Sequence, residues 1–345
     1  MEGNDEHIAI TCRKPEPKRH HYVPQSYLQN FAAIGGVGPN RICVYDKSTG
    51  AAQIRPIKNT AVIGQYYTFK DATGQPNTEL ERFFASVESR AAAIIRRWLE
   101  PGAVPSVSDI GDMAAYLACL YVRVPRCVEA ARDMIAATCV GMTEHLAEDP
   151  DRLQKAYDYV KAGGKLPDDF SIEDLRQLTK EFDSRFIVHV DEKYAIATSL
   201  SVVTAVCKQF MGMYWALCDS APFSGQFITC DAPVNVFTYH DGMAMFYGGL
   251  SGKDVEIHFP LSPTICVALS RTDRSKRRRA TPAFVREINK RTVLQAENYI
   301  FACTERQSVK KLIERYGGVV TRGIDADTIK SRVIHRLRRS AQRRA

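Results

Sequence analysis

The 345-residue sequence lacks several patterns that would assign a function class directly. None of its ten cysteines forms a C-x-x-C pair, which argues against a cysteine zinc site. We expect no disulfide framework, as in a reducing cytoplasm. No apolar run reaches the ~18 residues of a membrane span, and the start MEGNDEH lacks the apolar region of a signal peptide. Phosphate-loop, dinucleotide-binding and nucleophile-elbow motifs are also missing. These absences predict a globular cytoplasmic protein that does not enter a membrane.

The net charge of +8 is concentrated in two short segments. RTDRSKRRR, residues 271–279, carries six basic residues and one acid, and residues 329–345 carry seven basic residues and no acid. Such clusters suit nucleic acid or another polyanion, although a solvated loop and a frayed tail have the same composition. The residues that we assign to nucleic-acid binding are Arg274, Lys276, Arg277, Arg278, Arg279, Arg336, Arg338 and Arg339.

Hydrophobic periodicity predicts strands near both ends of the chain and helices between them. A hairpin is expected over 41–57, around the turn residues DKSTG, and one more short strand over 65–69. Helices are expected over about 79–100, 109–148 with a break at Pro125, 151–163, 171–183 and 196–218. Strands are expected at 226–230, 235–239, 244–248, 255–259 and 264–270, followed by a basic loop and two last helices.

This order of elements favours the α+β class, with a mixed or antiparallel sheet built from N- and C-terminal strands around a central, largely apolar helical block. We expect a flexible lead over 1–19 and a basic tail over 326–345. Between them we expect a single domain over 20–325, with its helical block at about 79–219. The oligomeric state does not follow from these patterns.

RHHYVPQSYLQNF, residues 19–31, places two adjacent histidines just before an expected helix. Pro24 suits the first turn of a helix, and the apolar residues after it share one helical face. The positive end of the helix dipole disfavours a charged imidazolium, so we expect His20 and His21 to be neutral. A neutral imidazole can bind a metal ion or accept a proton.

Other charged side chains stand in apolar surroundings. Glu81 and Glu88 are seven residues apart and share an apolar flank of the helix over 79–100. Arg123 is the only charged residue in MAAYLACLYVRV, and Arg126 follows it closely. Asp231 comes directly after a predicted strand, which would aim it rigidly. A structural interpretation stays open, because the acids can pair with arginine or reach water, and Asp231 can cap a turn.

Together these side chains suit metal-assisted phosphodiester hydrolysis. In this hypothesis the catalytic residues are His20, His21, Glu81, Glu88 and Asp231. A divalent ion, Mg²⁺ or Mn²⁺, would be held by Glu81, Glu88, Asp231 and His21, and phosphate by Arg123 and Arg126. The main alternative is a non-catalytic binding or sensor protein in which these residues form a structural network. A third is an enzyme for a small phosphorylated molecule. We expect at least one of the two glutamates to pair with Arg123 or to face a histidine.

Six segments resemble a known family: HHYVPQSYLQNFA, VYDKSTG, LERFFASVES, YVRVPR, FITCDAPV and FPLSP. In this order they are similar to a bacterial family described as domain of unknown function 4238, from about His20 to about Phe301. Asp231 keeps only part of that family's Ser-Asp-Asn-Pro context, because Cys230 and Ala232 replace two positions. The resemblance implies a shared fold and site without an established activity. HHYVP is also similar to nucleases whose histidine, before a proline-led segment, activates water beside a metal ion.

Overall fold

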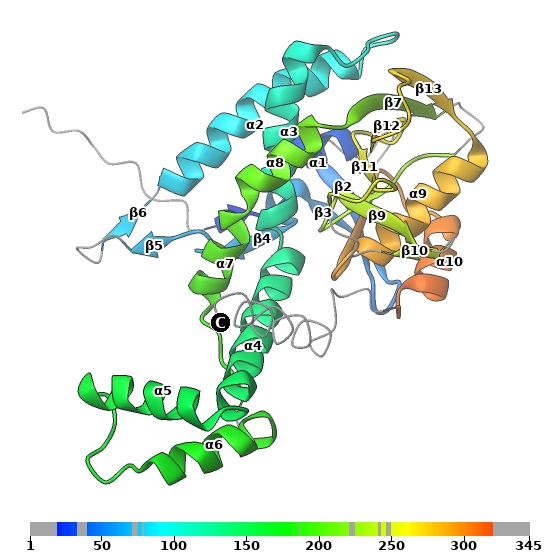
Figure 1. Cartoon of the computed structure of the whole chain (residues 1–345). Helices are drawn as coiled ribbons and strands as arrows, with labels where there is room; N and C mark the ends of the chain where they lie inside the picture. The colour runs from blue at the N-terminus through cyan, green and yellow to red at the C-terminus, as the bar shows by residue number, and fades with distance from the viewer. Residues whose placement is uncertain are drawn as a thin grey trace, which may run out of the picture.

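The computed structural model describes residues 19–32, 40–70, 75–77, 79–185, 187–220, 225–240, 243–245 and 250–319. Strands lie near both ends of this range and helices between them, so the expected α+β class is confirmed (Figure 1). Nearly all of the expected lead and all of the expected basic tail lie outside the described residues.

Strands from the two ends of the chain share one sheet, as the sequence predicted. This antiparallel sheet joins β2 (Arg41–Asp46) and β3 (Ala52–Pro56) to β8 (Thr229–Cys230) and β14 (Tyr299–Ala302), in the order β3–β2–β14–β8. The strands β1 (Arg19–His21) and β4 (Val62–Gly64) form a separate pair, and so do β5 (Phe69–Lys70) and β6 (Pro76–Asn77).

A second sheet is built only from strands of the C-terminal half. Its members are β7 (Tyr214–Ser220), β9 (Asn235–His240), β10 (Met243–Met245), β11 (Glu256–Pro260), β12 (Ile265–Ser270) and β13 (Arg277–Ala280). Their order is β10–β9–β11–β12–β7–β13, and the pairs are antiparallel except that β13 runs parallel to β7. The six-stranded sheet is therefore mixed, whereas the four-stranded sheet is antiparallel.

Helices surround the sheets and extend beyond them (Figure 1). The central block consists of α2 (Glu79–Trp98), α3 (Val107–Arg123), α4 (Pro125–Ala147), α5 (Pro150–Ala162), α6 (Ile172–Arg185), α7 (Glu192–Ser201) and α8 (Val203–Met211). The remaining helices are α1 (Gln25–Leu28), α9 (Pro282–Gln295) and α10 (Gln307–Tyr316). Figure 1 shows α4 leading away from the body to α5 and α6, which project from it, whereas α9 and α10 lie at the opposite side of the sheets.

The corner between α2 and α3 shows how local sequence positions the helices. Ser106 and Asp109 form a capping box at the start of α3, which satisfies free amide groups of its first turn. The Asp109 carboxylate also accepts hydrogen bonds from Trp98 Nε1 at 3.0 Å and from Arg97 Nη2 at 2.5 Å. One aspartate thereby ties the end of α2 to the start of α3.

The N-terminal segment is anchored in the main core. Tyr27 and Phe31 are fully buried, as their helical spacing predicted, and the Tyr27 ring stacks on Phe259 of β11 with ring centres 4.8 Å apart. The Tyr27 hydroxyl donates to the Pro260 carbonyl oxygen at 2.7 Å. Because β1 directly precedes this anchor, the two histidines are held against the body of the protein.

Three local predictions were wrong. The predicted helix over 196–218 ends at Met211, and β7 begins at Tyr214, because periodicity alone does not separate a buried apolar strand from a buried helix. The predicted strand over 65–69 is mostly a turn, with Gln65 at φ 50°. The predicted basic loop over 271–279 includes the start of β13, which pairs with the edge of β7.

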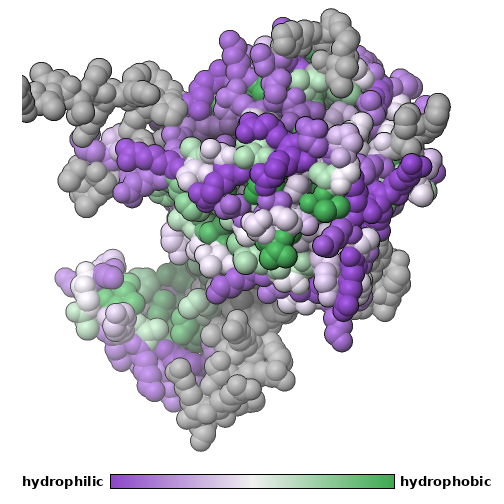
Figure 2. All heavy atoms as spheres, turned by 90° about the horizontal axis from the view of Figure 1, so that it is seen from above, coloured by the Kyte–Doolittle hydropathy of each residue, from purple (hydrophilic) through white to green (hydrophobic). Residues whose placement is uncertain are grey.

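One described segment, Glu192–Met211, has the length and composition of a membrane span, with 28% of its apolar window buried. It is divided into α7 and α8, which pack against α4 and α3 of the same chain. Length and composition alone are weak support for a membrane helix. In Figure 2 the body seen from above is largely hydrophilic with scattered hydrophobic residues, whereas hydrophobic residues gather on the projecting part at the lower left.

Candidate functional site

A cavity of about 500 Å³ lies where β1 and the start of α1 meet α2 and the end of α3. It brings together residues that are more than 100 positions apart in the sequence. Its wall is formed by Arg19, His20, His21, Pro24, Gln25, Ser26, Tyr67, Glu81, Arg82, Phe84, Ala85, Glu88 and Arg123. Five of the seven residues predicted as catalytic or phosphate-binding are therefore in one wall.

His20 is held on both ring nitrogens. Its Nδ1 accepts the Tyr67 backbone N–H at 2.8 Å, so in the neutral ring the proton is on Nε2, which lies 2.8 Å from Glu81 Oε1. The imidazole also stacks almost parallel to the Tyr67 ring, with ring centres 5.8 Å apart. His20 is thus a positioning residue for Glu81.

His21 presents a different arrangement. Its Nε2 is buried and has no hydrogen-bond partner among the described residues, whereas the imidazole bonds to the Lys58 backbone. We place that bond on Nδ1, so a neutral ring carries its proton there and has a free lone pair on Nε2. Burial lowers the pKa of His21, and the positive charges of Arg19 and Arg123 lower this pKa further. The expected neutral state agrees with this direction, but the main cause is burial rather than a helix dipole.

Arg123, which is buried, and Glu88, which is partly exposed, form the second bonded pair of the cavity. Arg123 Nη1 donates to Glu88 Oε1 at 2.7 Å, and Arg123 Nε donates to the Tyr22 carbonyl oxygen at 3.1 Å. The guanidinium lies over the Phe84 ring, 4.9 Å from its centre. Arg123 is only 2% exposed, and its Nη2 has no hydrogen-bond partner in the described structure. The prediction that a glutamate pairs with Arg123 or faces a histidine is confirmed twice.

With this geometry in place, the comparison with family models is informative. The family described as "Protein of unknown function (DUF4238)" matches residues 19–306, which is most of the chain. The chain belongs to this family. Comparisons with curated proteins and with solved structures gave no match. Membership in DUF4238 therefore confirms the resemblance and leaves the activity to be argued from the site.

Asp231, which lies in the DUF4238 segment FITCDAPV, is not among the residues that line the cavity. The Asp231 carboxylate is buried and accepts backbone N–H groups of Glu297, Asn298 and Tyr299 at 2.7 to 2.9 Å. Burial raises the pKa of Asp231 to about 6, although the three amide bonds act in the opposite direction. Asp231 therefore does not line the cavity with Glu81, Glu88 and His21, the residues expected to share a metal ion with it, because its oxygens fix the turn before β14.

We expect Asp231→Asn to lower the free energy of unfolding by about 2 to 3 kcal/mol, since buried amide donors lose an ionised acceptor. Chemical denaturation at pH 7.5, where Asp231 is ionised, measures the loss. The control is Asp112→Asn, which removes an exposed pair with Arg90 and should cost under about 1 kcal/mol. Equal stability of the two variants would contradict the anchoring role.

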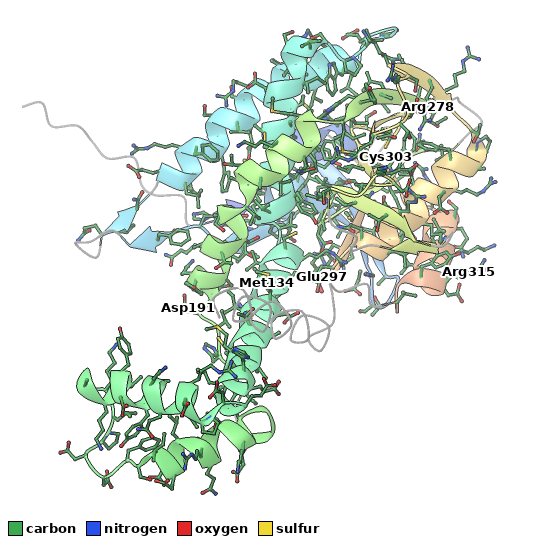
Figure 3. All side chains as sticks on the ribbon, viewed as in Figure 1. Met134, Asp191, Arg278, Glu297, Cys303 and Arg315 are labelled. Atoms are coloured by element: carbon green, nitrogen blue, oxygen red, sulfur yellow. The ribbon has the colours of Figure 1, made fainter. Side chains whose placement is uncertain are left out.

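Arg126 also lies outside the cavity wall. It is buried, and its Nη1 lies 3.6 Å from Glu297 Oε2, on the turn that Asp231 fixes. Figure 3 shows Glu297 close to α4, the helix that carries Arg126. The position of Arg126 therefore favours a structural ion pair over the predicted phosphate contact.

The basic segment before α9 is partly neutralised. Arg277 makes a two-pronged contact with Asp219, with both distances 2.6 Å, and Arg278 pairs with Asp273 at 2.8 Å. Arg274 lies over the Tyr214 ring, whereas Lys276 and Arg279 are exposed. The other three predicted nucleic-acid-binding residues, Arg336, Arg338 and Arg339, lie outside the described residues.

Sequence reasoning missed eight of the thirteen residues of the cavity wall, among them Arg19, Tyr67 and Arg82. Arg82 was not singled out in the sequence, and Arg19 was assigned to the expected lead, yet both line the wall. Tyr67 contributes its backbone N–H and ring to His20. Its turn is held by Lys193 Nζ, which donates to the Gln65 and Tyr66 carbonyl oxygens at 2.8 Å each. No local sequence pattern predicts the contact between Lys193 and Gln65, which are 128 positions apart.

The described residues fit a metal ion poorly. Among them, no three histidine, cysteine, aspartate or glutamate side chains are grouped closely enough to hold one. Glu81 is bonded to His20 and Glu88 to Arg123, so each carboxylate already faces a donor. We therefore derive no chemical step through a metal ion, and dependence on Mg²⁺ or Mn²⁺ stays a prediction for the assay.

Proposed function

We propose that this cavity hydrolyses phosphodiesters, with His21 as the general base and Arg123 as the anchor for a phosphoryl oxygen. The observation that carries the proposal is the pair of unsatisfied buried nitrogens, His21 Nε2 and Arg123 Nη2, in the wall of one cavity. Buried polar groups are normally hydrogen-bonded, and an exception calls for an explanation such as a bound water, a bound ion or a catalytic role.

The charge of the wall supports an anionic substrate. Three arginines and two glutamates give it a formal charge of +1 with neutral histidines. Arg123 keeps its positive charge in the buried wall, where its planar fork can bind an oxyanion with Nη2 while Nη1 stays on Glu88. A neutral phosphate mimic should bind less well than a charged one.

The chemistry assigned to each residue follows from its bonds. His21 Nε2 accepts a proton from the water that attacks phosphorus, and the backbone bond on the other nitrogen keeps the ring oriented. As the new P–O bond forms, the P–O bond to the leaving alcohol breaks, and the leaving oxygen takes a proton from solvent. Arg123 stabilises the charge that develops on a phosphoryl oxygen. Glu88 orients Arg123, and His20 orients Glu81 at the cavity rim.

A non-catalytic binding protein is the second candidate. It is favoured by the two bonded side-chain pairs, because His20 and Glu81, and likewise Arg123 and Glu88, satisfy one another without a ligand. In this interpretation the cavity binds an oxyanion, but His21 removes no proton. The two candidates differ in turnover and agree on binding.

The experiment incubates the purified full chain with single- and double-stranded DNA, RNA and bis(p-nitrophenyl) phosphate, with Mg²⁺, Mn²⁺ or a chelator. The proposal expects cleavage of at least one substrate, and activity in the chelator arm would show that no metal ion is needed. Absence of cleavage in every arm would reject hydrolysis and favour the binding protein.

The value of kcat/KM for phosphodiester cleavage should fall as the pH is lowered. Only the neutral form of His21 accepts a proton, and its pKa is below the usual value of about 6.5. We therefore expect a plateau of kcat/KM above pH 7 and a tenfold fall per pH unit at acidic pH, below the His21 pKa. The measurement is a pH–rate profile from pH 4.5 to 9. An acidic limb centred above pH 7 would contradict His21 as the base.

A further inference from the structure

A second and larger cavity, of about 790 Å³, lies between α9 and α10 on the side of the body away from α5 and α6 (Figure 1). Five basic side chains line it, Arg286, Lys290, Arg306, Lys311 and Arg315, together with one acid, Glu287. None of these basic residues belongs to the basic segments singled out in the sequence. We call this cavity the α9–α10 groove.

The positive charge of the α9–α10 groove is largely uncompensated. Glu287 is already engaged, because it accepts from Arg291 Nε at 3.0 Å and lies 3.4 Å from Lys290 Nζ. Arg306 donates to neutral acceptors, Thr304 Oγ1 and Cys303 Sγ. Arg286, Arg306, Lys311 and Arg315 pair with no carboxylate in the described part of the chain.

An aromatic ring stands in the wall of the groove. Lys290 Nζ lies 5.6 Å and Arg315 Cζ 5.3 Å from the centre of the Tyr316 ring, so two cations flank it. The other apolar wall residues carry no aromatic ring: Pro282, Ala283, Val285, Val309 and Leu312. A basic groove with an aromatic side chain is the arrangement by which proteins bind single strands, through backbone phosphates and one stacked base.

We propose that the α9–α10 groove binds the sugar–phosphate backbone of single-stranded nucleic acid. The α10 helix has ten residues and is about 15 Å long, enough to follow a few successive phosphates. An anionic membrane is the less favoured partner, because none of the exposed large apolar side chains of the described residues lies in the groove wall. The proposal concerns binding and does not rest on hydrolysis in the other cavity.

The test uses the full chain and a fluorescein-labelled 12-nucleotide oligo(dT), with binding measured by anisotropy from 50 to 300 mM KCl. The test variant is Lys311→Glu with Arg315→Glu, two exposed positions on α10; Figure 3 shows Arg315 at the edge of the body. The control is Lys155→Glu with Lys180→Glu, exposed positions on the projecting α5 and α6, which changes the net charge equally.

We expect the groove variant to bind oligo(dT) at least tenfold more weakly than the control at 100 mM KCl. Loss of two phosphate contacts should also flatten the slope of log K against log salt by about 1.4. Both variants should keep the wild-type Tm, since the four side chains are exposed. Wild-type protein that does not bind, or equal affinities of groove variant and control, would overturn the proposal. Tighter binding to duplex DNA or to anionic vesicles than to oligo(dT) would overturn it as well.

Discussion

Replacing His21 with alanine should lower the rate of phosphodiester cleavage by about 10²-fold or more, the usual contribution of a general base. His21 is half-buried and its Nε2 has no partner among the described residues, so the substitution removes no side-chain bond at that atom. The free energy of unfolding should fall only by about 1 kcal/mol, through the lost bond to the Lys58 backbone. Rates and denaturation midpoints of wild type and variant measure both effects.

His189→Ala provides the matched control, because His189 is an exposed histidine outside the cavity wall. It should keep the wild-type rate. Added imidazole should restore part of the rate of His21→Ala and none in the control, since the small base enters the space left by the side chain. A His21→Ala variant that cleaves at the wild-type rate would remove His21 from the mechanism.

The convergence of four site residues was predictable because each had an unmet physical need. Glu81 and Glu88 lie on an apolar flank of an amphipathic helix, and Arg123 lies in an apolar helix, so burial required partners for all three. The structure provides them, Glu88 for Arg123 and His20 for Glu81. The local sequence was sufficient to predict that these charged side chains have partners, because a charged residue on an apolar helix face is visible in the local sequence.

Asp231 had the same kind of need, yet its partner was not predictable. Its three donors are backbone amides of residues 297–299, at least 66 positions later, and a backbone amide has no signature in the sequence. The strand-end position of Asp231 suggested a side chain aimed at a ligand. The alternative that it caps a turn describes its contacts better, although the turn belongs to a distant segment.

The prediction of one helix across the boundary between α8 and β7 was wrong for a different reason. The run from residue 196 to 218 is mostly apolar, with Lys208 as its one charged residue, and apolar helices and apolar strands share that composition. The helix α8 ends with Gly212 as its C-cap, and β7, which follows, pairs with β12 and β13. Strand partners from far along the chain decide the outcome, so only the tertiary fold resolves it.

Glu88→Gln should lower the free energy of unfolding by about 3 kcal/mol, because it leaves the 2%-exposed Arg123 guanidinium without its counter-charge. Removing the other partner, by Arg123→Met, leaves Glu88 without its counter-charge. The free-energy cost of this unpaired charge should be smaller, since the Glu88 side chain is 28% exposed and can reach water. Urea denaturation of the two variants measures this difference.

Phosphate then distinguishes a ligand site from a closed structural network. If Arg123 receives a phosphoryl oxygen, inorganic phosphate replaces the missing carboxylate in Glu88→Gln and raises its Tm more than that of wild type. Chloride at equal ionic strength controls for screening. Glu129→Gln, which breaks a partly exposed pair with Arg132, should show no extra phosphate response. If the Tm of Glu88→Gln rises no more in phosphate than in chloride, no oxyanion reaches Arg123, and the anchor assigned to the cavity would be wrong.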